Sequence, residues 1–225
     1  GTLNGGTWQD GTMYFEIVPN SALELALWLE SDRMGYMLPT VTYDAFLNQQ
    51  QVVQNEKRQN YNNQPYGQTS YLIGKLLYPE GHPYNWTTIG ALEDLQNATL
   101  KDVHDFYTKW YGPNNATLVV AGDFDVEQTK EWIKKYFGEI KPSAPVTPLK
   151  PQLVQLETWK RASYEDNFAQ SPELTMLFPT VEQFTNDSYA LDVLADLIGR
   201  GKKSPLYKIV VGDKKLAPSV MTFNK

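Results

Sequence analysis

Few residues of this 225-residue sequence could bind a metal or act as a nucleophile, because it has two histidines and no cysteine. The lack of cysteine excludes disulfides, thiolate metal ligands and a cysteine nucleophile. His82 and His104 lie far apart, and neither belongs to an HxxEH or HExxH spacing. We therefore assign neither histidine a catalytic role. His82, in a Gly-His-Pro-Tyr segment, is expected to be a structural loop residue, and His104 an exposed or partly packed helix residue.

Glu56 is the one carboxylate whose predicted position needs an explanation. The pattern from Tyr43 to Tyr61 predicts a helix that Thr42 opens. At about 100° per residue, Glu56 falls near the middle of one side of this helix, with Gln49 and Asn60. The apolar residues that gather on that side are Ala45, Phe46, Val52 and Val53. The pattern thus aims a carboxylate at the core.

A lone ionised carboxylate in a core costs on the order of several kcal/mol, so it must be paired, protonated or bound to a metal. The residues alone leave three explanations of Glu56 open. It could bind a metal, form a salt bridge with a core arginine, or reach solvent if the helix is turned a little further. Geometry by itself does not make Glu56 a zinc ligand.

The rest of the sequence predicts a mixture of strands and helices. Strands are expected at 12–18, 116–121, 153–157, 174–178 and 219–223. Further helices are expected at 22–34, after Pro65 around 72–77, from Thr99 to Trp110, at 126–137 and at 188–198. Ser21 with Glu24 predicts a capping box, Thr99 with Asp102 opens a later helix, and Asp187 is the expected cap of the last one.

A proline-rich segment marks the expected domain boundary. Residues 141–151 carry four prolines, a density that neither a helix nor a central strand tolerates. A strand, a proline and a helix follow one another both around Pro19 and around Pro179. We therefore predict a first domain at 1–145 and the beginning of a second, similar domain at 146–225.

The composition excludes some classes of partner. With 20 Lys and Arg against 26 Asp and Glu, and a net charge of −6, the chain has no basic patch suited to nucleic acid. No run approaches the roughly 20 apolar residues that would span a bilayer, so we expect no transmembrane segment. The sequence begins without a recognisable leader, and the compartment cannot be deduced from it directly.

Short motifs follow one another along nearly the whole chain. They are Leu3–Thr7, Leu23–Leu27, Ser31–Met34, Val52–Glu56, His82–Tyr84, Tyr111–Ala116, Val119–Asp123, Tyr189–Asp192 and Ser204–Tyr207. In this order they resemble the pitrilysin/insulinase family of zinc peptidases, which includes the mitochondrial processing peptidases. The resemblance implies an α+β fold, an insulinase/processing-peptidase-like domain with a sheet covered by helices, followed by part of a second homologous, non-catalytic domain.

The same resemblance implies a zinc site to which this chain contributes one ligand. In the family an HxxEH motif supplies two histidines and a glutamate base, and a glutamate on a later helix supplies the third ligand. Glu56 matches that later glutamate, and two imidazoles with one carboxylate make a usual catalytic zinc set. HxxEH is expected before residue 1, which would make this chain an internal fragment. Such a fragment is expected to be inactive, with no catalytic residue of its own.

The resemblance also implies a substrate-binding strand. In relatives the strand corresponding to Leu3–Thr7 lies beside the metal and binds an extended peptide by strand addition. Asn4, Gly5 and Gly6 are thus implied substrate contacts, chiefly through their backbone groups. Alternatively, Gly5 and Gly6 simply form a turn.

One departure from the family pattern keeps a second function open. Many relatives carry an acidic residue followed by arginine where this chain has Gln49 and Gln50. The resemblance favours a zinc-dependent endopeptidase acting on peptides or unfolded polypeptides. A non-catalytic homologue that binds peptides or a homologous partner subunit is the alternative, and a structural domain with Glu56 in an ion pair is a third. The resemblance suggests the bacterial periplasm or cell envelope.

Overall fold

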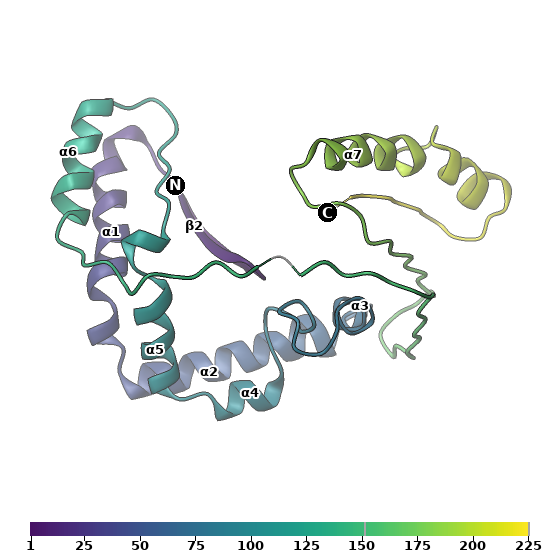
Figure 1. Cartoon of the computed structure of the whole chain (residues 1–225), viewed down its shortest axis with the longest axis horizontal. Helices are drawn as coiled ribbons and strands as arrows, with labels where there is room; N and C mark the ends of the chain where they lie inside the picture. Colours follow the sequence, from purple (N-terminus) through teal and green to yellow (C-terminus); the bar gives the residue numbers. More distant parts are fainter. Residues whose placement is uncertain (151, 225) are drawn as a thin grey trace. The chain divides into compact units, whose positions relative to one another are not determined.

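The structure, a computed structural model, describes residues 1–150 and 152–224 (Figure 1). Its strands are β1 (Thr2–Trp8) and β2 (Gly11–Ile17), and its α-helices are α1 (Leu23–Tyr36), α2 (Tyr43–Lys57), α3 (Thr69–Leu77), α4 (Leu92–Asn97), α5 (Leu100–Trp110), α6 (Val126–Phe137) and α7 (Asn186–Gly199). Two π-helical segments, Arg58–Asn62 and Tyr207–Asp213, add to these. The fold is α+β, dominated by helices.

The described residues form two compact units. Unit 1 extends to Val154 and includes Thr158–Glu173, and unit 2 takes in Gln155–Glu157 and the described residues from Leu174 on. All the α-helices except α7 lie in unit 1. The described residues between α6 and α7 contain neither a helix nor a strand, in keeping with the prolines there. A domain boundary between residues 145 and 146 stays a prediction.

The sheet of unit 1 is a single antiparallel hairpin. β1 and β2 pair from Thr2 opposite Ile17 to Trp8 opposite Gly11, joined by a two-residue turn. In the described part of the chain neither strand has a second neighbour. A two-stranded hairpin alone is marginally stable in water, so this one depends on the helices that it contacts.

The helices of unit 1 pack in pairs. α1 lies along α6, and α2 lies beside α4 (Figure 1). Leu27 of α1 and Phe46 of α2 are the most buried hydrophobic side chains in the described residues, at 3% and 8% exposure. Gln50 joins α2 to the end of α4, because its Nε2 donates to the carbonyl oxygens of Leu95 at 2.8 Å and Ala98 at 3.1 Å.

Most predicted helices are confirmed within a few residues, but their caps are less well predicted. The capping box of Thr99 and Asp102 is present. The box predicted for Ser21 and Glu24 is wrong, because a 3-10 turn precedes α1 and Ala22 takes the cap position without a side-chain bond. Glu24 instead accepts a hydrogen bond from the Tyr136 hydroxyl at 2.7 Å. α7 is capped by Thr185, not by Asp187. α4 was not predicted.

Four predicted strands are not formed. The segment at 12–18 is confirmed as β2, whereas 116–121, 153–157, 174–178 and 219–223 carry no strand among the described residues. Most of their apolar side chains are exposed to solvent, with Val119 at 77% exposure. Alternating apolar residues favour an extended chain, but a strand also needs a neighbour to satisfy its backbone groups. No described segment provides one here.

Candidate functional site

The outer edge of β1 is the first part of the candidate site. Every residue of β1 is exposed, and only one of its edges is paired within the described chain. A side chain on Gly6 would meet nothing within 4 Å, so another polypeptide could approach closely there. Asn4, Gly5 and Gly6 thus lie in a strand whose free edge can accept an extended peptide, and the alternative of a Gly5-Gly6 turn is wrong.

Gly5 faces a closer neighbour. A Cβ on Gly5 would lie 3.1 Å from Cδ1 of Tyr14, its partner across the hairpin. The Gly5 N–H donates to the side-chain oxygen of Asn4 at 2.8 Å. The glycine at this position therefore leaves room for the Tyr14 ring.

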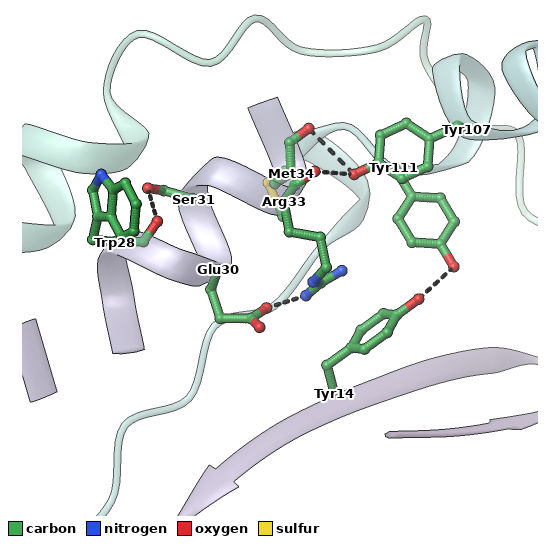
Figure 2. A network of polar contacts seen from close by, with 8 residues as sticks. All are labelled: Tyr14, Trp28, Glu30, Ser31, Arg33, Met34, Tyr107 and Tyr111. Atoms are coloured by element: carbon green, nitrogen blue, oxygen red, sulfur yellow. Dashed lines mark hydrogen bonds and ion pairs between the residues drawn. The ribbon is translucent and has the colours of Figure 1, made fainter. Parts of the chain in front are cut away.

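A polar network behind the hairpin ties it to two helices (Figure 2). The Arg33 guanidinium of α1 lies 3.6 Å from the centre of the Tyr14 ring and forms an ion pair with Glu30. The Tyr14 hydroxyl bonds to that of Tyr111 at 3.2 Å. The Tyr107 hydroxyl of α5 donates to the Arg33 carbonyl oxygen at 2.5 Å. Together these contacts join β2, α1 and the end of α5.

This network changes the acidity of its members. Burial, then the hydrogen bond with Tyr111, raises the pKa of Tyr14 to about 12. Burial, then a hydrogen bond and repulsion from Glu30, raises the pKa of Glu16 to about 7, and Arg33 partly opposes this. Glu16 and Glu30 line a cavity of about 830 Å³ together with residues of β1, β2 and α1. A pair of carboxyl groups in contact favours sharing a proton over ionising twice.

The sequence motifs gave this network no role. A sequence signal for part of it was present, because Glu30 and Arg33 lie three residues apart on a helix, the spacing of an i, i+3 ion pair. Tyr14 and Glu16 share one face of a strand by their spacing of two. The sequence did not indicate that the helix with Glu30 and Arg33 contacts the strand face with Tyr14 and Glu16.

Glu56 lies on the exposed side of α2. The expectation that it points into the core is wrong in this structure, and the alternative of a helix turned further towards solvent is what is found. The inner stripe runs through Phe46, Gln50, Val53 and Lys57. At about 100° per residue, Glu56 lies about 80° from Phe46 and falls outside this stripe, whose other residues lie within about 40° of Phe46. No hydrogen bond or ion pair joins Glu56 to another described residue, so its carboxylate is free to bind a ligand.

Neither histidine belongs to a group of metal-binding side chains in the described residues. His82 is 6% exposed, stacks on Tyr78 at 4.6 Å, and accepts the Tyr84 N–H at Nδ1. It is a structural loop residue, as predicted. His104 is partly packed on α5, where its buried Nε2 has no hydrogen-bond partner in the described chain.

A zinc site would need more ligands than these residues bring together. Within residues 1–150 and 152–224, no three histidine, aspartate or glutamate side chains meet in a group that could hold a metal. Glu56 suits zinc as one carboxylate ligand, since it is accessible and uncommitted. The described donors do not form a complete site.

Comparison with known proteins decides the family. Residues 97–225 match the family model described as the peptidase M16 inactive domain. The chain belongs to the M16 peptidase family. The resemblance to pitrilysin/insulinase peptidases is thereby confirmed.

Relatives of this M16 chain cover its whole length. The zinc protease PqqE of Helicobacter pylori is 33% identical over all of this chain and 50% of that protein. The crystal structure of a protease from Helicobacter pylori superposes with a TM-score of 0.76 and 27% identity, over 99% of this chain and 56% of the other. The chain thus spans about half the length of these relatives.

A third comparison concerns the fold alone. The first half of the periplasmic protease PqqL from Escherichia coli matches with a TM-score of 0.54 and 21% identity, over 67% of this chain and 33% of the other. The α+β prediction is confirmed by these structures. No described helix of the M16 chain is both long and apolar enough to cross a bilayer.

Proposed function

We propose that this M16 chain is part of a zinc-dependent endopeptidase that hydrolyses peptide bonds in peptides or unfolded polypeptides. The observation that carries the proposal is the match over the entire chain to PqqE, a protein named as a zinc protease. The chain contributes one metal ligand and a peptide-binding edge, and it supplies no catalytic residue itself.

Glu56 is the proposed zinc ligand. Its accessible and uncommitted carboxylate supports this role. The other ligands must come from outside the described residues, because no three-residue metal group exists within them. When bound, zinc would polarise the scissile carbonyl group and lower the pKa of a bound water.

Asn4, Gly5 and Gly6 are the proposed substrate contacts. The exposed and unpaired edge of β1 supports binding of an extended chain as an added strand. Backbone groups bind without regard to side-chain identity, so this edge suits unfolded polypeptides of varied sequence. The open space beside Gly6 lets the substrate backbone come close.

A non-catalytic homologue that binds peptides or a homologous partner subunit is the second candidate. It is favoured by the match of residues 97–225 to the model described as an inactive domain. Gln49 and Gln50 also favour it, since the Gln50 amide is occupied by the end of α4 and supplies no charge near Glu56.

The two candidates differ in zinc content and peptide cleavage. We would express the complete reading frame that contains these residues, and measure bound zinc and chelator-sensitive cleavage of unfolded casein. For a zinc peptidase, Glu56→Gln should lower zinc occupancy at least about tenfold and abolish cleavage. Glu139→Gln, at an exposed glutamate after α6, is the matched control and should leave both unchanged. A zinc-free protein that binds casein without cleaving it would support the second candidate.

We also propose the periplasm or cell envelope as the compartment. The support is the fold shared with PqqL from Escherichia coli, which is described as a periplasmic protease. Fractionation of cells that produce the complete protein tests this, and recovery with the cytoplasmic markers would contradict it.

A further inference from the structure

The Tyr14 ring contacts two structural elements at once. On the hairpin it packs against Gly5 of β1, where any Cβ would come within 3.1 Å of the ring. On α1 it meets the Arg33 guanidinium, whose Cζ is 3.6 Å from the ring centre. A planar guanidinium at this distance stacks on the ring and attracts its negative face. Arg33 and the edge strand are thus joined through one aromatic side chain.

Arg33 is itself held in place from two directions. Its side chain is 25% exposed and forms an ion pair with Glu30, which is 20% exposed, so both are partly shielded from water. Its carbonyl oxygen accepts the Tyr107 hydroxyl of α5. Tyr111, just after α5, bonds to the Tyr14 hydroxyl at the other end of the network (Figure 2).

The hairpin needs such an anchor. In the described chain β1 and β2 pair only with each other, and a lone hairpin is marginally stable. The face of the hairpin that bears Met13, Phe15 and Ile17 is exposed. The contacts with Arg33 and Tyr111 come from the opposite face, through Tyr14.

We propose that Arg33 is a positioning residue for peptide binding: through Tyr14 it holds the β1–β2 hairpin, and with it the peptide-binding edge, against α1 and α5. This inference rests on the proposed function for the role of the edge. The anchoring of the hairpin can be tested independently. Arg33 does not touch the substrate, and its effect reaches Gly5 through the Tyr14 ring.

If Arg33 acted only through an exposed i, i+3 ion pair with Glu30, the expected result of a lysine substitution would be different. Such a pair contributes little, and lysine would replace arginine in it without loss. A stacked guanidinium is different, because lysine keeps the charge but cannot lay a planar group on the ring. Arg33→Lys should therefore anchor the hairpin less well than the unmodified chain does, but better than Arg33→Ala.

Amide hydrogen exchange of the chain is the first test. Arg33→Ala should speed exchange of the protected amides of β1 and β2 about tenfold or more, while α6 keeps its rates. Arg33→Lys should fall between Arg33→Ala and the unmodified chain. Arg200→Ala is the matched control, because Arg200, just after α7, also forms an ion pair with an acidic residue of the neighbouring helix, in unit 2, whose described residues form no strand. Unchanged exchange in the hairpin, or an equal increase in α6, would overturn the proposal.

Binding of fluorescein-labelled unfolded casein to the complete protein is the second test. Arg33→Ala should raise the Kd about tenfold, and Tyr14→Phe, which keeps the ring but not the bond to Tyr111, should raise it less. If casein fails to bind the unmodified protein, the proposed function fails, while hydrogen exchange still decides whether Arg33 anchors the hairpin. If Arg33→Ala unfolds the chain, hydrogen exchange of the β1 and β2 amides is compared in Arg33→Lys, Tyr14→Phe and the unmodified chain instead. Equal exchange rates in all three would overturn the proposal.

Discussion

Replacing Glu16 by glutamine should change how the stability of unit 1 depends on pH. In the folded chain the pKa of Glu16 is raised from 4.5 to about 7, first by burial and then by Glu30. The folded state therefore binds a proton more tightly than the unfolded state between about pH 4.5 and 7. The free energy of unfolding should fall as pH rises through this window and stay level above it. Glutamine mimics the protonated carboxyl group and does not titrate.

The magnitude follows from the size of the pKa change. A rise from 4.5 to about 7 corresponds to roughly 3 kcal/mol if the whole effect is retained. Glu16 is only partly buried, so water screens the interaction, and about 1 kcal/mol is the realistic expectation. Glu16→Gln should thus be more stable than the unmodified chain by about 1 kcal/mol at pH 8, and equal to it near pH 4.5.

Urea unfolding followed by tryptophan fluorescence measures this difference. All six tryptophans lie in unit 1, so the signal reports that unit. Titrations at pH 4.5, 5.5, 6.5 and 8 would give the free energy of unfolding of each variant. Glu139→Gln is the control and should follow the unmodified chain. Parallel pH profiles for Glu16→Gln and the unmodified chain, or a less stable Glu16→Gln at pH 8, would refute the reasoning.

Two further predictions concern the packing of α1 and the segment Thr158–Glu173 of unit 1. Leu27→Ala removes a buried side chain of α1 and should lower the free energy of unfolding by about 2 to 4 kcal/mol in urea unfolding. Leu25→Ala, at a 56% exposed position of the same helix, should cost under about 1 kcal/mol. Asp166 accepts the backbone N–H groups of Phe168, Tyr66 and Ala169, which lower the pKa of its carboxyl group. Asp166→Ala should release Thr158–Glu173 from unit 1 and speed its cleavage by a nonspecific protease severalfold. An unchanged cleavage rate there would show that other contacts hold the segment.

Local signals predicted the helices well. The Thr99 and Asp102 box opens α5, and Thr42 accepts the Ala45 N–H at the start of α2, both as predicted. Such caps act within one turn, so neighbouring residues suffice to specify them. The same reasoning failed at Glu24, because a 3-10 turn shifts the start of α1 and the Glu24 carboxylate bonds to a tyrosine hydroxyl more than a hundred residues away. A local rule cannot include a distant partner.

Strands and helix faces were less predictable. The residues at 116–121 have the composition of a strand, but no neighbouring strand meets them in the described chain. The prediction of which side of α2 is buried was also wrong, because the apolar residues Ala45 and Val52 are exposed. In the structure α4 sets the inner side of α2 through Gln50, and Glu56 is left exposed.

The sequence by itself determined the family, the order of the helices other than α4, the hairpin strand at β2 and the absence of cysteine chemistry. These features depend on residue types and short spacings, so the local sequence is enough to specify them. Only the tertiary structure decided that Glu56 faces solvent, that Gln50 binds α4, and that Arg33 reaches Tyr14. Such contacts join residues far apart in the chain, and they are fixed by which faces can pack together, a choice that the sequence leaves open until the elements meet.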